Sequence, residues 1–157
     1  MSHSYVSCYI HYVFSTKGRI PCLTADIRER LWPYMGGIAR DKGMEALLIG
    51  GEVDHAHALI TLPSTLSIAK GIQLIKGPSS KWMHEQFPSL QPFAWQEGYA
   101  AFSVGYASLE NVKAYIRQQA EHHRRHTYQE EFLAFLQKYH IPYDERYLWG
   151  DDSCFVG

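Results

Sequence analysis

Two short, largely apolar runs in the middle of the chain, residues 44–51 and 55–62, constrain the fold most strongly. The stretch Gly-Glu-Val-Asp, which begins with the last residue of the first run, links them. Runs of this length joined by so few residues are typical of a hairpin or of adjacent antiparallel strands. Any fold for this chain must therefore be built around that pair of strands.

A strand and then a helix precede the hairpin, and a helix and then a strand follow it. The expected elements are a strand at residues 5–15, a helix at about 25–42, a helix at 67–87 and a strand at 95–104. This order predicts an α+β fold, a ferredoxin-like or RRM-like βαββαβ antiparallel sheet with helices on one face. Two C-terminal helices, at about 108–125 and 128–139, and an irregular tail are expected to follow.

Proline and glycine residues set the expected ends and breaks of these helices. Thr24 is a good N-cap for the first helix, and Gly43 is a plausible stop. Pro33, with the glycine pair that follows it, predicts that this helix is kinked or broken. Gly77 and Pro78 predict an interruption of the second helix in the same way.

The composition fits one globular domain over residues 1–157. The chain is 46% hydrophobic and 20% charged, which excludes intrinsic disorder. Because there is no leader pattern and no apolar run that could span a bilayer, we expect a cytoplasmic protein without membrane contact. The three scattered cysteines form no CxxC pair and are typical of reduced thiols.

The charge is nearly balanced overall but uneven along the chain. Fifteen Lys and Arg oppose sixteen Asp and Glu, giving a net charge of -1. Residues 126–157 carry two basic and six acidic residues, so the first 125 residues are net positive. We expect a catalytic core at about 5–125 and an acidic C-terminal helix and tail at about 126–157, without an assigned role. The overall balance does not exclude a nucleic-acid partner.

The first chemical feature is the motif His55-Ala56-His57 on the third predicted strand. Side chains alternate along a strand, so both histidines point to one face, while Ala56 and Ala58 point to the other. Two imidazoles side by side can hold a metal ion from one direction and leave positions for a third ligand and a substrate. Two histidines whose ring nitrogens are hydrogen-bonded within the protein would give the same motif. A metal site therefore needs a third ligand in addition to the pair.

The helix at 108–125 offers that partner. Gln119 and His122 follow Tyr115 at i+4 and i+7, which places the three on one stripe of a helix with about 100° per residue. An aliphatic stripe would be usual on a packing helix. The amide oxygen of Gln119 is a hard ligand that suits Mg²⁺ or Mn²⁺ and lies one turn from the phenol of Tyr115.

These features together resemble the single-tyrosine HUH transposases. This family comprises the small enzymes of the simplest bacterial insertion sequences and their domesticated relatives, the REP-associated tyrosine transposases. The resemblance covers most of the chain in short segments that occur in the family's order. The matching segments are residues 13–17, 54–60, 75–81, 95–99, 103–105 and 112–123. Ala56 departs from the bulkier apolar residue that is more usual in the family at this position.

The resemblance implies a ferredoxin-like core, a divalent metal (Mg²⁺ or Mn²⁺), no organic cofactor and a homodimer that binds single-stranded or hairpin DNA. It implies that Tyr115 is the catalytic nucleophile and that His55, His57 and Gln119 are metal ligands, with His122 as a possible supporting residue. The expected activity is that of a DNA transposase, a metal-dependent single-strand endonuclease and strand transferase that forms a covalent 5′-phosphotyrosine intermediate. In such dimers the tyrosine helix of one subunit can complete the site of the other.

Several basic residues are candidates for contacts with DNA phosphates. They lie after the first strand, at the two ends of the Lys-Gly-Pro-Ser-Ser-Lys run of the second helix, and beside Tyr115. The candidates are Lys17, Arg19, Lys76, Lys81 and Arg117. Each of them alone could equally be a solvated surface charge.

Three other interpretations stay open from the sequence. A ferredoxin-like RNA- or DNA-binding module would leave the histidine pair without a role. A metal hydrolase of small molecules would leave Tyr115 and Gln119 unexplained. A domesticated nuclease that binds palindromic DNA without mobility would keep all four residues, and the DNA that flanks the gene would distinguish it from a mobile element.

Overall fold

The computed structural model describes residues 3–90 and 93–149, and its centre is a four-stranded antiparallel sheet. The strands are β1 (Tyr9–Ser15), β2 (Glu45–Glu52), β3 (His55–Thr61) and β4 (Ala100–Val104). Their order across the sheet is β2-β3-β1-β4, with β1 paired to both β3 and β4. The expected hairpin is formed by β2 and β3, and the predicted α+β ferredoxin-like sheet is confirmed.

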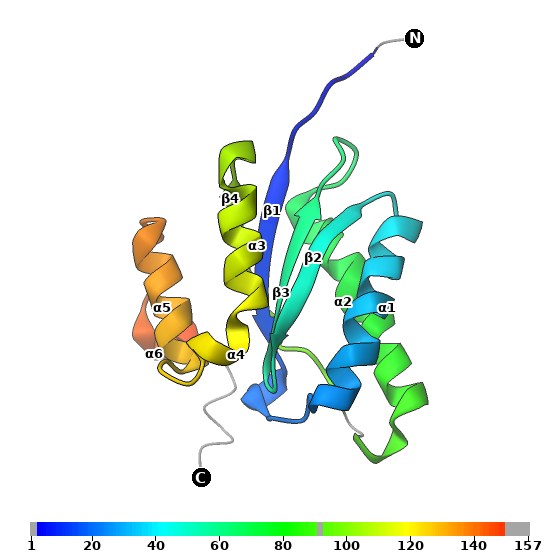
Figure 1. Cartoon of the computed structure of the whole chain (residues 1–157), viewed down its shortest axis with the longest axis vertical. Coiled ribbons are helices and arrows are strands. Elements are labelled where there is room, and N and C mark those ends of the chain that lie inside the picture. The colour runs from blue at the N-terminus through cyan, green and yellow to red at the C-terminus, as the bar shows by residue number, and fades with distance from the viewer. Residues whose placement is uncertain (1–2, 91–92, 150–157) are drawn as a thin grey trace.

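Helices cover both faces of this sheet (Figure 1). Helices α1 (Ala25–Asp41) and α2 (Ile68–Gln86) pack on one face and against each other. The C-terminal helices lie on the opposite face: α3 (Leu109–Arg117), α4 (Gln119–His122) and α5 (Tyr128–Lys138), followed by α6 (Glu145–Leu148). Short 3-10 turns occupy Lys17–Arg19, Pro88–Leu90 and Tyr106–Ser108. The tail that we expected to be irregular thus contains the short helix α6.

Strand alternation divides the buried residues into two sets. On β1, Tyr12 and Phe14 join the apolar core beneath α1 and α2, and Ala56 and Ala58 of β3 join the same core. Val13 packs instead with residues of β4 and α5 on the other face. The sheet therefore carries an aliphatic and aromatic core on one side and leaves its second side for the C-terminal helices.

The predicted helix breaks in α1 and α2 are wrong. Both helices continue through Pro33 and Pro78. A proline removes one backbone hydrogen bond, but the buried face of each helix continues on both sides of it, as with Ile75 and Met83 in α2. The free energy gained by packing the buried face outweighs the loss of one backbone hydrogen bond at each proline. The expected stop at Gly43 fits its φ of 84°, which lies in the left-handed region that favours glycine.

The predicted single helix at 108–125 is instead two. Gln118 leaves the helical conformation, with φ -95° and ψ 20°, and separates α3 from α4. The fourth strand is also shorter than predicted, since Trp95 forms only an isolated bridge to Thr16 before β4 begins at Ala100. Within the described residues, no helix combines the length and apolar character that crossing a lipid bilayer requires.

Candidate active site

The two histidines of β3 lie side by side under the C-terminal helices. His55 and His57 are both fully buried, and their ring centroids are 5.2 Å apart. Ala56 points to the opposite core, as strand alternation predicts. The strand therefore holds two imidazoles on one rigid face.

Each histidine uses its Nδ1 for a protein partner and turns its Nε2 toward a common centre. His55 Nδ1 lies 2.7 Å from the Asp54 carboxylate, and His57 Nδ1 lies 2.8 Å from Nε2 of His11 on β1. The Nε2 of His55 lies 2.9 Å from Oε1 of Gln119. Partners of this kind fix the orientation of metal-binding imidazoles. Sequence analysis gave neither Asp54 nor His11 a role.

A carboxylate that sequence analysis missed enters this centre from α5. Glu131 is only 3% exposed, and its Oε1 lies 2.9 Å from His57 Nε2. Its Oε2 lies 2.5 Å from His123 Nε2 and 3.6 Å from His55 Nε2. The sequence carried one signal, because Glu131 shares the buried side of α5 with Tyr128 and Phe132, where an acidic residue is unusual. The acidic C-terminal segment thus contributes to the site.

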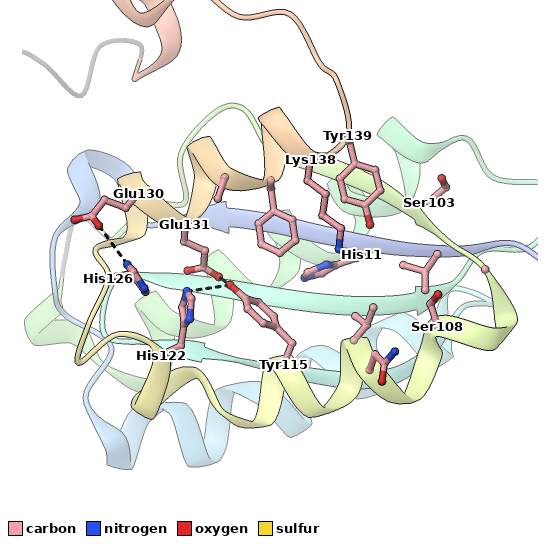
Figure 2. A pocket seen from close by; sticks show the side chains of 16 residues that line it. His11, Ser103, Ser108, Tyr115, His122, His126, Glu130, Glu131, Lys138 and Tyr139 are labelled. Atoms are coloured by element: carbon pink, nitrogen blue, oxygen red, sulfur yellow. Dashed lines mark hydrogen bonds and ion pairs between the residues drawn. The ribbon is translucent and has the colours of Figure 1, made fainter.

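Tyr115 reaches the same carboxylate from α3. Its hydroxyl donates to Glu131 Oε1 and lies 3.3 Å from His122 Nε2 (Figure 2). Its ring centroid is 5.7 Å from that of His57. Gln119 is 2% exposed, and its Nε2 lies 3.4 Å from Glu131 Oε1. The predicted stripe of Tyr115, Gln119 and His122 therefore converges on the histidine pair within one chain, despite the break at Gln118.

The cluster is strongly polarised. Burial alone would raise the pKa of Glu131, but the close imidazoles of His123 and His57 hold it far below its usual range. Burial lowers the pKa of His57, whereas the neighbouring Glu131 carboxylate outweighs burial at His123 and raises its pKa. Burial, and then the Glu131 charge, raises the pKa of Tyr115. At neutral pH the carboxylate is thus ionised and the phenol keeps its proton.

The donor set fits a divalent cation. Ligand atoms of His55, His57 and Glu131 all lie within 4.8 Å of one another. The buried His57 Nε2 and Glu131 Oε2 make no hydrogen bond of acceptable geometry within the described chain. Buried polar atoms are rarely left in this state unless a partner such as an ion completes them. Two imidazoles with a carboxylate and an amide oxygen are ligands that Mg²⁺, Mn²⁺ and Zn²⁺ sites use.

The five basic candidates for DNA contacts do not form one surface. Lys81 is exposed on α2, and Arg117 is exposed on α3, so they lie over opposite faces of the sheet. Lys17 is exposed in the turn after β1, and Arg19 in that turn stacks over Trp149 at 5.3 Å. The Lys76 ammonium is bonded to backbone carbonyls at residues 96–98 and holds that loop in place.

Comparison with known proteins gives one consistent family. The family model described as "Transposase IS200 like" matches residues 4–119. Transposases for insertion sequence element IS200 from Salmonella typhimurium and Salmonella typhi are each 26% identical over 126 residues, covering 77% of this chain and 82% of the relative.

Solved structures show the same fold. A crystal structure of a candidate transposase from Deinococcus radiodurans R1 superimposes with a TM-score of 0.62 at 25% identity, covering 76% of this chain and 96% of that one. A REP-associated tyrosine transposase bound to a REP hairpin matches with a TM-score of 0.57 at 17% identity, covering 78% and 73%. The second likeness, at its low identity, concerns the fold alone.

Proposed function

The chain belongs to the family of IS200-like transposases and is a DNA transposase, and from this premise we propose that Tyr115 is the nucleophile with which it cleaves and rejoins single DNA strands. The observation that carries the proposal is the convergence of one phenol, two imidazoles and two side-chain oxygens in a single buried cluster. A small-molecule hydrolase would need the histidines but not the tyrosine.

We propose that His55 and His57 hold a divalent metal, Mg²⁺ or Mn²⁺, together with oxygen ligands from Gln119 and Glu131. Support comes from the buried His57 Nε2 and Glu131 Oε2, which make no hydrogen bond of acceptable geometry within the described residues, and from the hard oxygen donors on two different helices. When bound, such an ion acts as a Lewis acid that offsets charge on the scissile phosphate.

In the proposed step, the Tyr115 oxygen attacks phosphorus, the bond from phosphorus to the 3′ oxygen breaks, and a 5′-phosphotyrosine forms. The phenol releases its proton, and the departing 3′ oxygen takes one up. In the structure the phenol donates to Glu131 Oε1. With that carboxylate turned to the metal, His122 Nε2, 3.3 Å from the phenol oxygen, would accept the phenol proton, because burial lowers the pKa of His122 and keeps its ring neutral. A later attack by a 3′ hydroxyl reverses the step and joins a new strand.

We propose hairpin-forming single-stranded DNA as the substrate, which the hairpin complex of the REP-associated relative supports by analogy of fold. A homodimer stays a prediction from the resemblance. Because one chain already brings Tyr115 to within 5.7 Å of His57 between ring centroids, each subunit has the groups for a site of its own.

The decisive experiment incubates the protein with labelled single-stranded oligonucleotides that carry hairpins from the DNA flanking the gene, with Mg²⁺ or Mn²⁺ or with EDTA. We expect a covalent protein–DNA band that needs the metal and disappears in Tyr115→Phe. Tyr106→Phe is the matched control, because Tyr106 is 77% exposed near the start of α3 and should leave the band intact. A band that persists in Tyr115→Phe would refute the assignment.

A further inference from the structure

A cavity of about 690 Å³ opens beside Tyr115, between helices α3 and α5 (Figure 2). Tyr115, His122 and Glu131 form part of its wall, whereas the buried pair His55 and His57 does not line it. Tyr115 therefore lies on the boundary between the polar cluster and the cavity. The volume lies within the range of about 300–1,000 Å³ that is usual for small-molecule sites.

The floor of the cavity is aromatic and held rigidly. Phe135 of α5 and Tyr139, which caps that helix, both stack on Phe102 of β4, with ring centroids 5.1 and 4.7 Å apart. Val112 and Ala134 add apolar surface on either side. Planar side chains fixed in this way offer stacking surfaces for a planar ligand at little entropic cost.

The rim is polar and open to a ligand. Ser103, Ser108 and Asn111 line it, and none of their side chains makes a hydrogen bond within the described chain. Lys138 reaches into the cavity toward His11 (Figure 2) and adds a positive charge. A flat apolar floor with free donors and acceptors at its edge and a nearby cation matches the chemistry of a nucleotide, whose base stacks and whose phosphate is anionic.

We propose that this cavity binds the unpaired nucleobase of one of the two nucleotides that flank the scissile phosphate, and so sets part of the sequence preference of cleavage. The inference rests on the proposed function, because it places the scissile phosphate at the Tyr115 oxygen. The nucleotide next to that phosphate is one backbone step away, and Tyr115 itself lines the cavity. The aromatic floor can then stack the base while the α3 polar groups contact its edge.

The test uses a pool of oligonucleotides with a hairpin from the DNA flanking the gene, followed by randomised single-stranded positions. Covalent adducts are captured with Mg²⁺ or Mn²⁺. Sequencing the attached fragment and the released fragment then identifies the nucleotides on both sides of the cleaved bond. For the wild type we expect one base to be favoured by about tenfold or more at one flanking position. An abasic residue at that position should slow adduct formation by a similar factor.

Asn111→Ala and Ser108→Ala should weaken the base preference several-fold while adduct formation with the pooled DNA persists. Glu110→Gln is the matched control on the same helix, because Glu110 is exposed and does not line the cavity, and it should keep the wild-type preference. As a binding readout, 2-aminopurine at the preferred position should be quenched by Tyr115→Phe protein, which cannot form the adduct, and less so when Phe135→Leu is added.

The outcomes separate the two proposals. If no DNA forms an adduct with the wild type, the proposed function fails. If adducts form but both flanking positions are random, or if the preference is unchanged in the cavity variants, the cavity does not read the base and this inference is overturned. A preference that the cavity variants leave intact would arise from pairing within the DNA.

Discussion

On strand β1, Tyr12 and Phe14 turn toward helices α1 and α2, whereas His11 and Val13 turn toward the C-terminal helices. The same strand thus supplies an apolar core to one face and a polar site to the other. On the first face the neighbours are mostly aliphatic and aromatic side chains. On the second face buried polar side chains lie against specific partners, as with Nδ1 of His57 at 2.8 Å from Nε2 of His11.

This difference separates stability from function along a single strand. Burial of apolar surface has no directional requirement. The sheet face that packs against α1 and α2 therefore tolerates substitution by other apolar side chains of similar volume. A buried polar cluster depends on each hydrogen bond and each charge, since an unmatched group is costly. Substitutions on the apolar face should therefore change the free energy of unfolding, and those on the polar face should change chemistry.

The largest expected effect is that of Phe14→Ala on the apolar face. Phe14 is fully buried and packs against Trp95, with ring centroids 4.9 Å apart. Removal of the ring should lower the free energy of unfolding by about 3–5 kcal/mol. Urea unfolding measures the loss, with Phe14→Leu as a milder control. Covalent adduct formation per folded molecule should stay near the wild-type level, and a large loss of it at temperatures where the variant is folded would contradict the division between the faces.

A pair of glycines makes the second test. A Cβ at Gly50 of β2 would lie 2.8 Å from Cγ2 and 3.3 Å from the carbonyl oxygen of Ile116, so Gly50→Ala must push α3 away from the sheet. We expect a loss of about 1–3 kcal/mol in unfolding free energy and a fall of up to about 100-fold in adduct formation, because Tyr115 moves with α3.

Gly36→Ala is the control on the opposite face. A Cβ there would lie 3.9 Å from Cβ of Ala46, an ordinary contact, and alanine favours the helix. This variant should keep full activity and gain up to about 1 kcal/mol in stability. Equal activity of both variants would show that the position of α3 on β2 does not control the site.

The two faces also differ in how far the sequence could predict them. Alternation along β3 correctly placed His55 and His57 on one face of the sheet and Ala56 and Ala58 on the other. This pattern depends only on neighbouring residues of one strand. The wheel position of Gln119 survived the break at Gln118. The helix breaks at Pro33 and Pro78 were wrongly predicted, since local propensity gives way to tertiary packing.

Glu131 could not be assigned from the sequence for a different reason. Its contacts with His57 and Tyr115 arise only when α5 folds back over the sheet, and no local pattern specifies that long-range docking. The cavity between α3 and α5 depends on the same docking. Local patterns thus predicted which strand residues share the face of the candidate site, whereas the position of the Glu131 carboxylate beside them could be seen only in the structure.

Glu131→Gln tests whether this carboxylate belongs to the metal site. Loss of its charge should weaken Mn²⁺ binding by about 10- to 100-fold, because a neutral amide is a poorer ligand. Thermal unfolding with and without Mn²⁺ measures the effect, since a metal that binds the native state raises Tm. Glu130→Gln is the control, because that neighbouring carboxylate is exposed. If Mn²⁺ raised the Tm of the wild type and of Glu131→Gln equally, Glu131 would not be a metal ligand, and Gln119 would supply the oxygen ligand.

The smallest expected effect concerns Lys76, an ionisable group on α2 on the otherwise apolar side. Its ammonium lies 5.6 Å from the centre of the Phe14 ring and is hydrogen-bonded to the carbonyls of Gln96 and Gly98. Burial lowers the pKa of Lys76 to about 8. Between this value and the ordinary value of 10.5, the unfolded chain binds more protons than the folded chain, so the contribution of Lys76 to stability rises with pH.

We therefore expect the free energy of unfolding, measured in urea from pH 7.5 to 9.5, to rise more steeply with pH in the wild type than in Lys76→Gln. The difference should be less than about 1 kcal/mol per pH unit, below the single-proton limit of about 1.4, because solvent screens this part-exposed group. Comparison of the two slopes cancels Cys22, whose buried thiol has a raised pKa and acts in the opposite direction. Parallel slopes would mean that the carbonyl contacts offset the burial of the ammonium.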